Sequence, residues 1–573
     1  MYKQFPDPSV LDESFQPTCH VPIKKMHAFV EACAREHPAS VALKYLGRKI
    51  TYQQLNDAID DCARGLMALG VQTDDVVSIC MPNTPETVVL FYAVNRIGGI
   101  CNMIHPMAPV RQVLDIVTET NSPYLCFPEL FLPRFAEGIE RAPGPLRRIV
   151  VAPMARSAPA LKRFALWAAH GRKAMRRLPA SDRWITWDDL VKKGRRIDAS
   201  PHVESDPLHT SVYLHSGGTT ASPKTIMLSD DNFNNVAYPI ATAIGIPEGA
   251  TASRHHAMIT VLPLFHGFGL CIGMHAMMVH GFTCILVPKF SADDLADIIK
   301  KERPTLMAGV PTLYEAMLNS DRFRDVDLSC FRALFCGGDS LTPELKQRFD
   351  RFLEAHHSAF KLREGYGLTE TVTVCSLTHD RSSDRSGIGT PLANMQMKIV
   401  DPDTKAILPD GEIGEICVTG PTVMQGYLNA PEATAFALVE HDDGQVWVET
   451  GDLGYRDPDG FYHFTSRIKR MIKVSGVPVY PSQIEQAVAE FPEVLQVAAI
   501  GIPHPYKMNV VKLFLRVRPD TDTAALEQKI EAKIKTNMLR YALPKAYEYI
   551  DVFPTTLIGK IDYKALEARE HDA

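Results

Sequence analysis

The chain has 573 residues, of which 46% are hydrophobic and 22% charged, and its formal net charge is −6. At roughly 100 to 200 residues per domain this length predicts several compact units, and the composition excludes a disordered chain. The mild negative charge argues against a protein that binds nucleic acid polymers along its surface.

The cysteines and the first residues indicate a reducing compartment. Twelve cysteines are spread from Cys19 to Cys417 without a CxxC pair or zinc-finger spacing, so we interpret them as small buried hydrophobic residues. The first fifteen residues carry Asp7, Asp12 and Glu13 and no apolar stretch, so they do not resemble a secretory signal. We therefore expect a cytoplasmic protein.

Helical and strand patterns alternate in the N-terminal half. Residues 28–37, 52–69 and 85–99 have the apolar spacing of helices, and residues 75–81 are typical of a strand. Strands that alternate with helices indicate mostly parallel sheets covered by helices on both faces. This half is therefore predicted to have an α/β fold.

The segment 147–180 is basic, contains no acidic residue and carries the aromatic residues Phe164 and Trp167. Its nine basic residues are Arg147, Arg148, Arg156, Lys162, Arg163, Arg172, Lys173, Arg176 and Arg177. A basic helix with aromatic side chains can lie on an anionic membrane surface, which predicts peripheral membrane contact. The alternative is an exposed insertion whose charges only keep the protein soluble.

Residues 257–288 contain no Lys, Arg, Asp or Glu and are long enough to span a bilayer. Prolines, glycines and histidines interrupt this stretch, and the histidines would be costly in hydrocarbon. Its pieces 259–264, 268–280 and 282–288 have the lengths of a strand, a helix and a strand. We predict a buried β-α-β unit and not a membrane helix.

Two smaller units follow in the C-terminal part. Residues 395–466 include two strand patterns joined through a Pro-Asp-Gly turn, which predicts a β-rich subdomain. From about residue 470 the pattern is helix, strand, strand, helix, which indicates a compact α+β unit. We therefore predict an α/β and α+β chain, with a large N-terminal domain over residues 1–468 and a small C-terminal domain over 469–573.

The segment HSGGTTASPKTIMLS at 215–229 gathers groups that neutralise a polyphosphate: backbone N–H groups, hydroxyls and the Lys224 ammonium. The small or hydroxylated residues before the lysine are Ser216, Gly217, Gly218, Thr219 and Thr220. Pro223 and Thr225 on either side of Lys224 exclude the Walker pattern. The segment resembles the phosphate-binding signature of the AMP-forming adenylate ligases, the superfamily of acyl-CoA synthetases, firefly-type luciferases and peptide-synthetase adenylation domains.

Further motifs of this superfamily follow in order between about Ile50 and Lys560. They are ITYQQL at 50–55, VLPLFHGFG at 261–269, CGGDSL at 336–341, GYGLTE at 365–370, TGDLGYRDPDG at 450–460, SRIKRMIKVSGVPVYPSQIE at 466–485 and PTTLIGK at 554–560. In the same order, they resemble the superfamily's opening motif, the gate beside the acyl pocket, the adenine loop, the central motif, the ribose loop, the inter-domain hinge and the terminal lysine motif. The chain departs from the superfamily at Ala221, Thr225 and Thr555, where Gly, Gly and Lys are usual.

The resemblance implies a role for each matching residue. It places Gly338, Asp339, Tyr366 and Gly367 at the adenine, Asp452 and Arg467 at the ribose, Ser216 to Thr220 with Lys224 at the phosphates, and Lys469, Ser475 and Gly476 at the hinge and thiol tunnel. The catalytic residues it implies are Lys560, Thr369, Glu370 and His266, the last as the gate. A carboxylate together with phosphate oxygens suits Mg²⁺, so Glu370 is the implied metal ligand.

The implied reaction has two steps and uses ATP, Mg²⁺ and coenzyme A. A carboxylate attacks the α-phosphate of ATP and releases pyrophosphate, and a thiol then converts the acyl adenylate into a thioester and AMP. Catalysis rests on positioning the two anions and offsetting their repulsion with Lys560, Lys224 and Mg²⁺. The small domain moves about the hinge between the two steps.

The residues around the expected acyl pocket are apolar, flexible or small: Phe265, His266, Met274, Met277, Met278, Gly309, Val310 and Pro311. They predict a medium- to long-chain fatty acid, although methionines at these positions also suit plain core packing. Three alternatives stay open: an acyl-AMP ligase that loads a phosphopantetheine carrier protein, an aryl or short-chain acid CoA ligase, and a membrane-associated binding pseudoenzyme.

Overall fold

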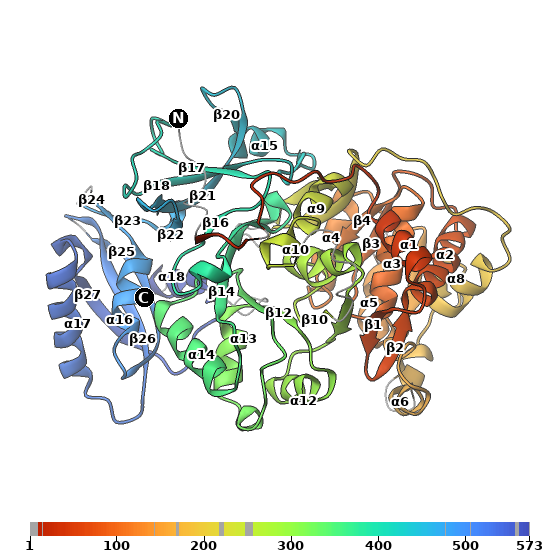
Figure 1. Ribbon diagram of the computed structural model, residues 1–573, viewed down its shortest axis with the longest axis horizontal. Helices are drawn as coiled ribbons and strands as arrows, with labels where there is room; N and C mark the ends of the chain where they lie inside the picture. Colours follow the sequence, from red (N-terminus) through yellow and green to blue (C-terminus); the bar gives the residue numbers. More distant parts are fainter. Residues whose placement is uncertain are drawn as a thin grey trace.

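The computed structural model describes residues 10–13, 15–141, 144–167, 171–216, 223–246, 256–475, 477–504, 506–555 and 561–571. Within these ranges the chain forms a large body of parallel sheets and helices, followed by a smaller α+β unit (Figure 1). The predicted fold class is thereby confirmed.

An eight-stranded sheet forms the first half of the body. Its strands, in spatial order, are β19 (Gly426–Tyr427), β9 (Thr225–Ser229), β8 (Thr210–His215), β4 (Ile100–Met103), β3 (Val76–Ile79), β5 (Tyr124–Pro128), β6 (Arg148–Ala152) and β7 (Trp184–Thr186). The run from β8 to β7 is parallel, while β8 and β9 are antiparallel. Strands β3, β4 and β5 are buried along most of their length, as continuous apolar strands of a covered parallel sheet are.

A nine-stranded sheet forms the second half. Its order is β16 (Thr390–Pro391), β15 (Val374–Leu377), β14 (Leu362–Gly367), β13 (Ala333–Cys336), β12 (Leu306–Gly309), β10 (Ala257–Thr260), β11 (Thr283–Leu286), β1 (Val41–Tyr45) and β2 (Arg48–Thr51). The strands from β14 to β1 are parallel. The carboxyl end of β14 carries the GYGLTE motif, so this edge of the sheet positions it.

The helices of the body are α1 (His27–Glu36), α2 (Tyr52–Ala68), α3 (Pro85–Arg96), α4 (Val110–Glu119), α5 (Leu132–Arg141), α6 (Ala160–Leu166), α7 (Arg172–Met175), α8 (Trp187–Gly194), α9 (Asp230–Ala237), α10 (Ile240–Ala243), α11 (Ala276–Val279), α12 (Ala292–Glu302), α13 (Pro311–Leu318), α14 (Pro343–Ala355) and α15 (Pro431–Ala437). Most of them cover these two sheets, whereas α6 projects from the body and α15 lies beside β20 (Leu438–Glu440) of a third sheet (Figure 1). The three helices expected at 28–37, 52–69 and 85–99 are confirmed as α1, α2 and α3. Helix α2 begins at a capping box in which Thr51 and Gln54 satisfy each other's backbone N–H groups.

The uncharged stretch 257–288 folds as the predicted β-α-β unit, because β10 and β11 are parallel neighbours with a helical crossover between them. The crossover differs from an ordinary helix: Phe268–His275 is a π-helix, and only Ala276–Val279 is α-helical. Within the part of the chain that the structure describes, no helix is long and apolar enough to cross a membrane.

The basic segment 147–180 is not one continuous helix. It is divided among β6, the short helix α6 and the shorter helix α7. Three large apolar side chains on α6 and at its end are exposed: Leu161 by 83%, Phe164 by 65% and Trp167 by 47%. The expected basic helix is therefore present only as two short helices, while the aromatic residues are exposed.

Two five-stranded sheets complete the chain. The first contains β17 (Gln396–Val400), β18 (Gly414–Thr419), β21 (Val446–Arg456), β20 (Leu438–Glu440) and β22 (Tyr462–Arg467). The second contains β24 (Val477–Val479), β23 (Ile472–Val474), β26 (Met508–Val517), β25 (Val494–His504) and β27 (Pro544–Tyr549), with helices α16 (Pro481–Ala489), α17 (Thr523–Asn537) and α18 (Tyr563–His571). None of the twelve cysteines, all within the described residues, forms a disulfide, and nine are buried.

Candidate active site

The base of the phosphate-loop segment is closed by two hydrogen bonds. Strands β8 and β9 lead into and out of the segment as an antiparallel pair. The Ser216 backbone N–H donates to the Lys224 carbonyl at 2.9 Å, and the Lys224 N–H donates to Ser216 Oγ at 3.0 Å. Of the residues between them, all but Pro223 lie outside the described residues: Gly217, Gly218, Thr219, Thr220, Ala221 and Ser222.

Just before this loop, His215 is held as a neutral imidazole. Its Nε2 lies 2.7 Å from Asn102 Oδ1, and its Nδ1 lies 3.2 Å from Thr225 Oγ1. Asn102 donates its own amide to Ser78 Oγ, so Asn102 Oδ1 is an acceptor and Nε2 of His215 carries the proton. Burial lowers the pKa of His215 to about 4.

Tyr427 joins the phosphate-loop lysine to the central motif. The Lys224 Nζ lies 4.4 Å from the centre of the Tyr427 ring, and the Tyr427 hydroxyl donates to Glu370 Oε1 at 2.7 Å. Strand β19 carries Tyr427 and pairs with β9, which begins directly after Lys224. Sequence reasoning missed Tyr427, since nothing in GYLN distinguishes it from an ordinary strand residue.

The central motif ends in a strained turn. Val372 has φ 66° and ψ −55°, and the Thr373 N–H donates across it to the Thr371 carbonyl at 2.7 Å, which makes a γ-turn. A β-branched residue in this region costs about 1–3 kcal/mol, and such strain is concentrated at functional sites. The turn follows Thr369 and Glu370, so it restrains the backbone positions from which their side chains extend.

Two glycines let other backbone segments approach this turn. A Cβ on Gly367 would lie 1.5 Å from the Thr373 carbonyl oxygen, and a Cβ on Gly267 would lie 1.8 Å from the Val372 carbonyl oxygen. Neither contact can be relieved by a side-chain rotation, because the obstacle is backbone. Glycine is therefore required where the gate segment meets the central motif.

The predicted adenine and ribose residues form one chain of contacts. The Tyr366 hydroxyl donates to Asp452 Oδ2 at 2.8 Å, and Arg467 Nε lies 3.1 Å from Asp452 Oδ1. Asp452 on β21 and Arg467 on β22 are opposite each other in the antiparallel register. Burial, and then the charge of Asp452, raise the pKa of Tyr366 well above its ordinary value, so the phenol stays a donor.

The gate segment is fixed from the side of the first sheet. Asn83 accepts from the Leu264 N–H at 3.0 Å and donates to the carbonyls of Thr260 and Leu262. His266 Nδ1 accepts from the Phe268 N–H at 3.3 Å, and the Phe265 ring lies 4.2 Å from the His105 ring centre. The predicted gate residue His266 therefore lies on a segment whose backbone is held by hydrogen bonds with Asn83.

The expected adenine loop is open to solvent. Gly338 has φ 78°, and both it and Asp339 are exposed. Asp339 Oδ1 accepts from the Ser340 N–H at 2.9 Å. The charge of Asp339 also contributes to raising the pKa of Tyr563, after burial and Glu485, which places the α18 end of the small unit close to this loop.

At the hinge two predicted positions are exposed, and a residue between them that was not predicted is held in place. Lys469 and Ser475 are exposed, and Ser475 has φ 52°. Between them, Arg470 pairs with Glu485 at 2.6 Å and lies 3.6 Å from the centre of the Tyr563 ring. Gly476 and Lys560 lie outside the described residues.

The methionines expected near the acyl pocket are core residues. Met274, Met277 and Met278 are at most 2% exposed, and the Tyr52 hydroxyl contacts the Met277 carbonyl from α2. Phe265 and Val310 are partly buried at the edge of the same core. The packing alternative therefore describes the methionines, while Phe265 and Val310 stay available to an acyl chain.

Comparison with known proteins adds three findings. The AMP-binding enzyme family matches residues 30–428, and the AMP-binding enzyme C-terminal domain matches residues 483–560. A long-chain-fatty-acid–CoA ligase of Bacillus subtilis is 29% identical over 94% of this chain and 94% of its own length, and a feruloyl-CoA synthase of Amycolatopsis is 29% identical over 92% and 95%. The structure of the anthranilate CoA ligase AuaEII with anthranoyl-AMP is similar in fold, with a TM-score of 0.80, 21% identity, and coverage of 96% of this chain and 98% of that one.

Proposed function

Because the chain belongs to the AMP-binding enzyme family and is an AMP-forming acid–CoA ligase of the adenylate-forming superfamily, we propose that it activates a medium- to long-chain fatty acid. ATP and the acid give acyl-AMP and pyrophosphate, and coenzyme A then gives acyl-CoA and AMP. The observation that supports the ATP-dependent activation is that two contact chains lie together at the end of β14. One runs from Tyr366 to Arg467 and the other from Glu370 to Lys224.

The first contact chain suits a nucleoside. Asp452 is buried and its neighbours Tyr366 and Arg467 hold the carboxylate in place, so its acceptor oxygens can meet the ribose hydroxyls. Gly338 and Asp339, which are exposed, are placed by the resemblance at the adenine edge. The resemblance assigns Gly367 to the same pocket, and its lack of a Cβ leaves room for the Thr373 carbonyl behind it.

The second contact chain suits phosphate and a divalent cation. One Glu370 oxygen accepts from Tyr427, and the other is a hard donor of the kind that Mg²⁺ prefers alongside phosphate oxygens. Bound Mg²⁺ would supply positive charge against the polyphosphate. Thr369, Lys224, Ser216 and the loop from Gly217 to Thr220 are assigned to the phosphates.

The carboxylate oxygen attacks the α-phosphorus of ATP, and the bond to the β-phosphate oxygen breaks as pyrophosphate leaves. We assign Lys560 to the charge that builds up between the two anions in this step. In the second step the thiolate displaces AMP from the acyl carbon.

We propose residues 1–468 and 469–573 as the two domains, with Lys469 at the hinge and Ser475 and Gly476 beside the thiol.

Three observations support an apolar acid. Phe265 on the gate segment is partly buried, Val310 is partly buried at the edge of the same core, and the relative in Bacillus subtilis is named a long-chain-fatty-acid–CoA ligase. The aryl-acid relative leaves feruloyl-type acids as the competing substrate class.

The test is pyrophosphate release by the full chain against a panel of straight-chain acids of increasing length and of aryl acids, with coenzyme A present and absent. Activity that rises with chain length and thioester formation with coenzyme A are expected. A preference for acetate or an aryl acid would overturn the fatty-acid assignment, and thioester formation only on a carrier protein would favour the acyl-AMP ligase. Absence of adenylation with every acid would favour the pseudoenzyme.

A membrane surface is proposed as a second partner, through α6. Leu161 and Phe164 lie three residues apart on α6, both project into solvent, and Lys162 and Arg163 stand between them. Apolar side chains beside cations match the interface of an anionic bilayer. Leu161→Ser with Phe164→Ser should lower cosedimentation with phosphatidylserine vesicles, whereas Phe436→Ser, which alters an even more exposed aromatic on α15, should not. Equal loss in both variants would contradict the assignment.

A further inference from the structure

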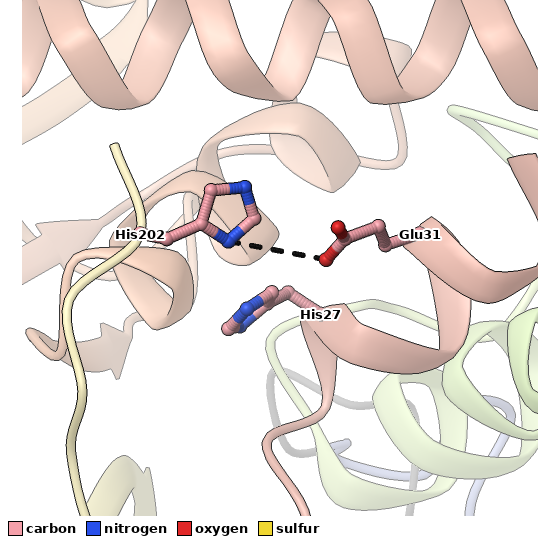
Figure 2. Close-up of side chains that lie close together, drawn as sticks. All are labelled: His27, Glu31 and His202. Carbon is pink, nitrogen blue, oxygen red and sulfur yellow. Dashed lines mark ion pairs between the residues drawn. The ribbon is translucent and has the colours of Figure 1, made fainter. Parts of the chain in front are cut away.

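Two histidines and a glutamate converge on a face of the body that the adenylation site does not use. His27 and Glu31 are one helical turn apart on α1, and His202 lies on the segment that connects α8 to β8 (Figure 2). One ligand atom from each of the three side chains lies within 4.8 Å of the other two. His202 Nδ1 is 3.9 Å from Glu31 Oε2, and the two imidazole ring centres are 5.8 Å apart.

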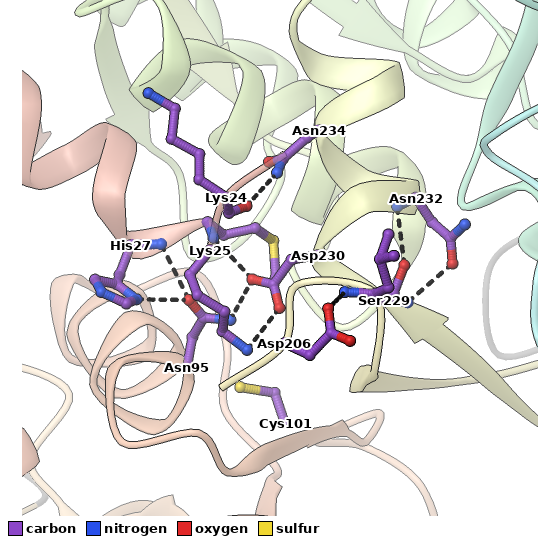
Figure 3. A network of polar contacts seen from close by, with 12 residues as sticks. Lys24, Lys25, His27, Asn95, Cys101, Asp206, Ser229, Asp230, Asn232 and Asn234 are labelled. Carbon is purple, nitrogen blue, oxygen red and sulfur yellow. Dashed lines mark hydrogen bonds and ion pairs between the residues drawn. The ribbon is translucent and has the colours of Figure 1, made fainter. Parts of the chain in front are cut away.

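The buried histidine of this cluster has a fixed ring and tautomer. Asn95 Oδ1 accepts from the His27 backbone N–H at 3.0 Å and lies 3.1 Å from His27 Nδ1 (Figure 3). Asn95 Nδ2 donates to Asp230 Oδ1, so Asn95 Oδ1 is an acceptor and His27 Nδ1 carries the proton. Nε2 of His27 therefore keeps its lone pair. A histidine held through one nitrogen by an amide oxygen is the arrangement that metal-binding histidines use.

The cations nearest to this cluster are already paired. Lys25 Nζ lies 2.8 Å from Asp230 Oδ2, and the buried Arg96 contacts Asp60 and Asn56. Glu31 adds one negative charge within the cluster. Two further acids, Glu204 and Asp206, line the same hollow as His27 and His202, so the local charge does not exclude a dication.

We propose that His27, Glu31 and His202 bind a divalent transition-metal ion, with Zn²⁺ as the best match. Two imidazoles and one carboxylate are a zinc ligand set that leaves a fourth position for water or another ligand. That position would face the open hollow of about 640 Å³ beside His27 and His202.

Tetrahedral Zn²⁺ bonds of about 2.0–2.1 Å place ligand atoms about 3.4 Å apart, so the side chains need to close by about 1 Å. His202 and Glu31 have exposed fractions of 43% and 39%, which leaves them free to make that movement. Metal binding would then tie the α8–β8 connection to α1. This site is separate from the proposed Mg²⁺ position at Glu370, and it uses different ligand chemistry.

The test begins with the full chain stripped of metal by a chelator and titrated with Zn²⁺, with bound metal measured by elemental analysis. Co²⁺ is titrated in parallel, because its visible bands report tetrahedral coordination. Wild-type protein should bind one equivalent and melt at a higher temperature with Zn²⁺. His202→Ala and Glu31→Gln should each weaken binding by at least about 10-fold and remove the stabilisation.

The matched control is His209→Ala, which removes an exposed histidine from the same connection, 3.6 Å from Asp206. It should bind Zn²⁺ as the wild type does. Both ligand variants alter partly exposed side chains, so their metal-free melting temperatures should equal that of the wild type and report intact folding. Wild-type affinity in both ligand variants, or equal loss in His209→Ala, would overturn the proposal. Adenylation with Mg²⁺ alone should continue in the stripped protein, so a failure of the zinc site is distinguishable from a failure of the ligase function.

Discussion

The large body and the small C-terminal unit hold their predicted functional residues in different ways. In the body, Asp452 is met by Tyr366 and Arg467, and Glu370 by Tyr427, all from other strands. At the hinge, Lys469 and Ser475 are exposed. The difference indicates that Asp452 and Glu370 are positioned in the absence of substrate, and it is the arrangement expected if the proposed hinge residues act through movement of the small unit.

The substitution that should best distinguish the role of the small unit from that of the body is Lys560→Ala. We expect pyrophosphate release to fall by about 10²–10³-fold, because a preorganised charge at the developing transition state is lost. Thioester formation from preformed acyl adenylate and coenzyme A should be retained, since that step does not use this lysine. Both half-reactions are measured by single-turnover kinetics.

The control is Lys564→Ala, which removes an exposed lysine from α18 four residues later. It should leave both half-reactions unchanged. Equal loss of both half-reactions in Lys560→Ala would mean that the lysine supports the fold of the small unit and not the first step alone.

A change in the body should instead act on nucleotide use. Asp452→Asn removes the charge that Tyr366 and Arg467 contact, so kcat/KM for ATP should fall by about 10–100-fold, as expected for hydrogen bonds to a charged group. Asp457→Asn is the control, because Asp457, directly after β21, pairs with His463 on β22 and not with Tyr366 or Arg467. Steady-state kinetics with ATP as the varied substrate measure this fall in kcat/KM. An unchanged KM and kcat in Asp452→Asn would show that the contacts of Asp452 in the body do not serve ATP binding.

The junction between the gate and the central motif is tested by Gly267→Ala. The added methyl would meet the Val372 carbonyl, and we expect the free energy of unfolding to fall by about 1–3 kcal/mol together with the rate of adenylation. Gly273→Ala, in the π-helix of the same segment, meets Thr260 only at 3.5 Å and should be tolerated. Urea denaturation measures both variants, and equal stability of the two would show that the Val372 turn can shift.

Sequence motifs identify candidate site residues best where a motif coincides with the end of a strand, as at 365–370, which begins within β14. They did not predict Tyr427, because the residue reaches Glu370 only through the pairing of β19 with β9, and β19 is two residues long. The π-helix at Phe268–His275 was also missed, since an almost wholly apolar run carries no periodicity that distinguishes it from an α-helix.

The basic segment 147–180 and the histidine cluster are two further features whose structure the sequence alone did not predict. Charge and aromatic content identified the segment, but its division into β6, α6 and α7 follows from the sheet that it joins. His202 lies near His27 and Glu31 despite a long sequence separation, because the connection after α8 passes beside α1 (Figure 2). Residues that depend on such long-range packing have no local pattern to mark them.

Tyr427→Phe is a smaller change within the body. It removes the hydroxyl from Glu370 and keeps the ring beneath Lys224, so adenylation should fall by about 10-fold and need more Mg²⁺. Tyr455→Phe, in a ring stacked on His463, is the control and should have no effect. Magnesium titration of pyrophosphate release measures both, and an unchanged magnesium dependence would contradict the link between Tyr427 and the metal position.

Stability should also depend on pH through His215, beside the phosphate loop. Its pKa is about 4 in the folded chain and near 6.5 when unfolded, so the unfolded state binds the extra proton first as pH falls. The stabilising contribution is complete above pH 6.5 and is lost toward pH 4, at about 1.4 kcal/mol per pH unit. His215→Gln should remove that slope between pH 6.5 and 4, whatever it costs at neutral pH. Urea denaturation across this range measures the slope, and a variant as acid-sensitive as the wild type would show that the imidazole beside the phosphate loop already carries a proton in the folded body.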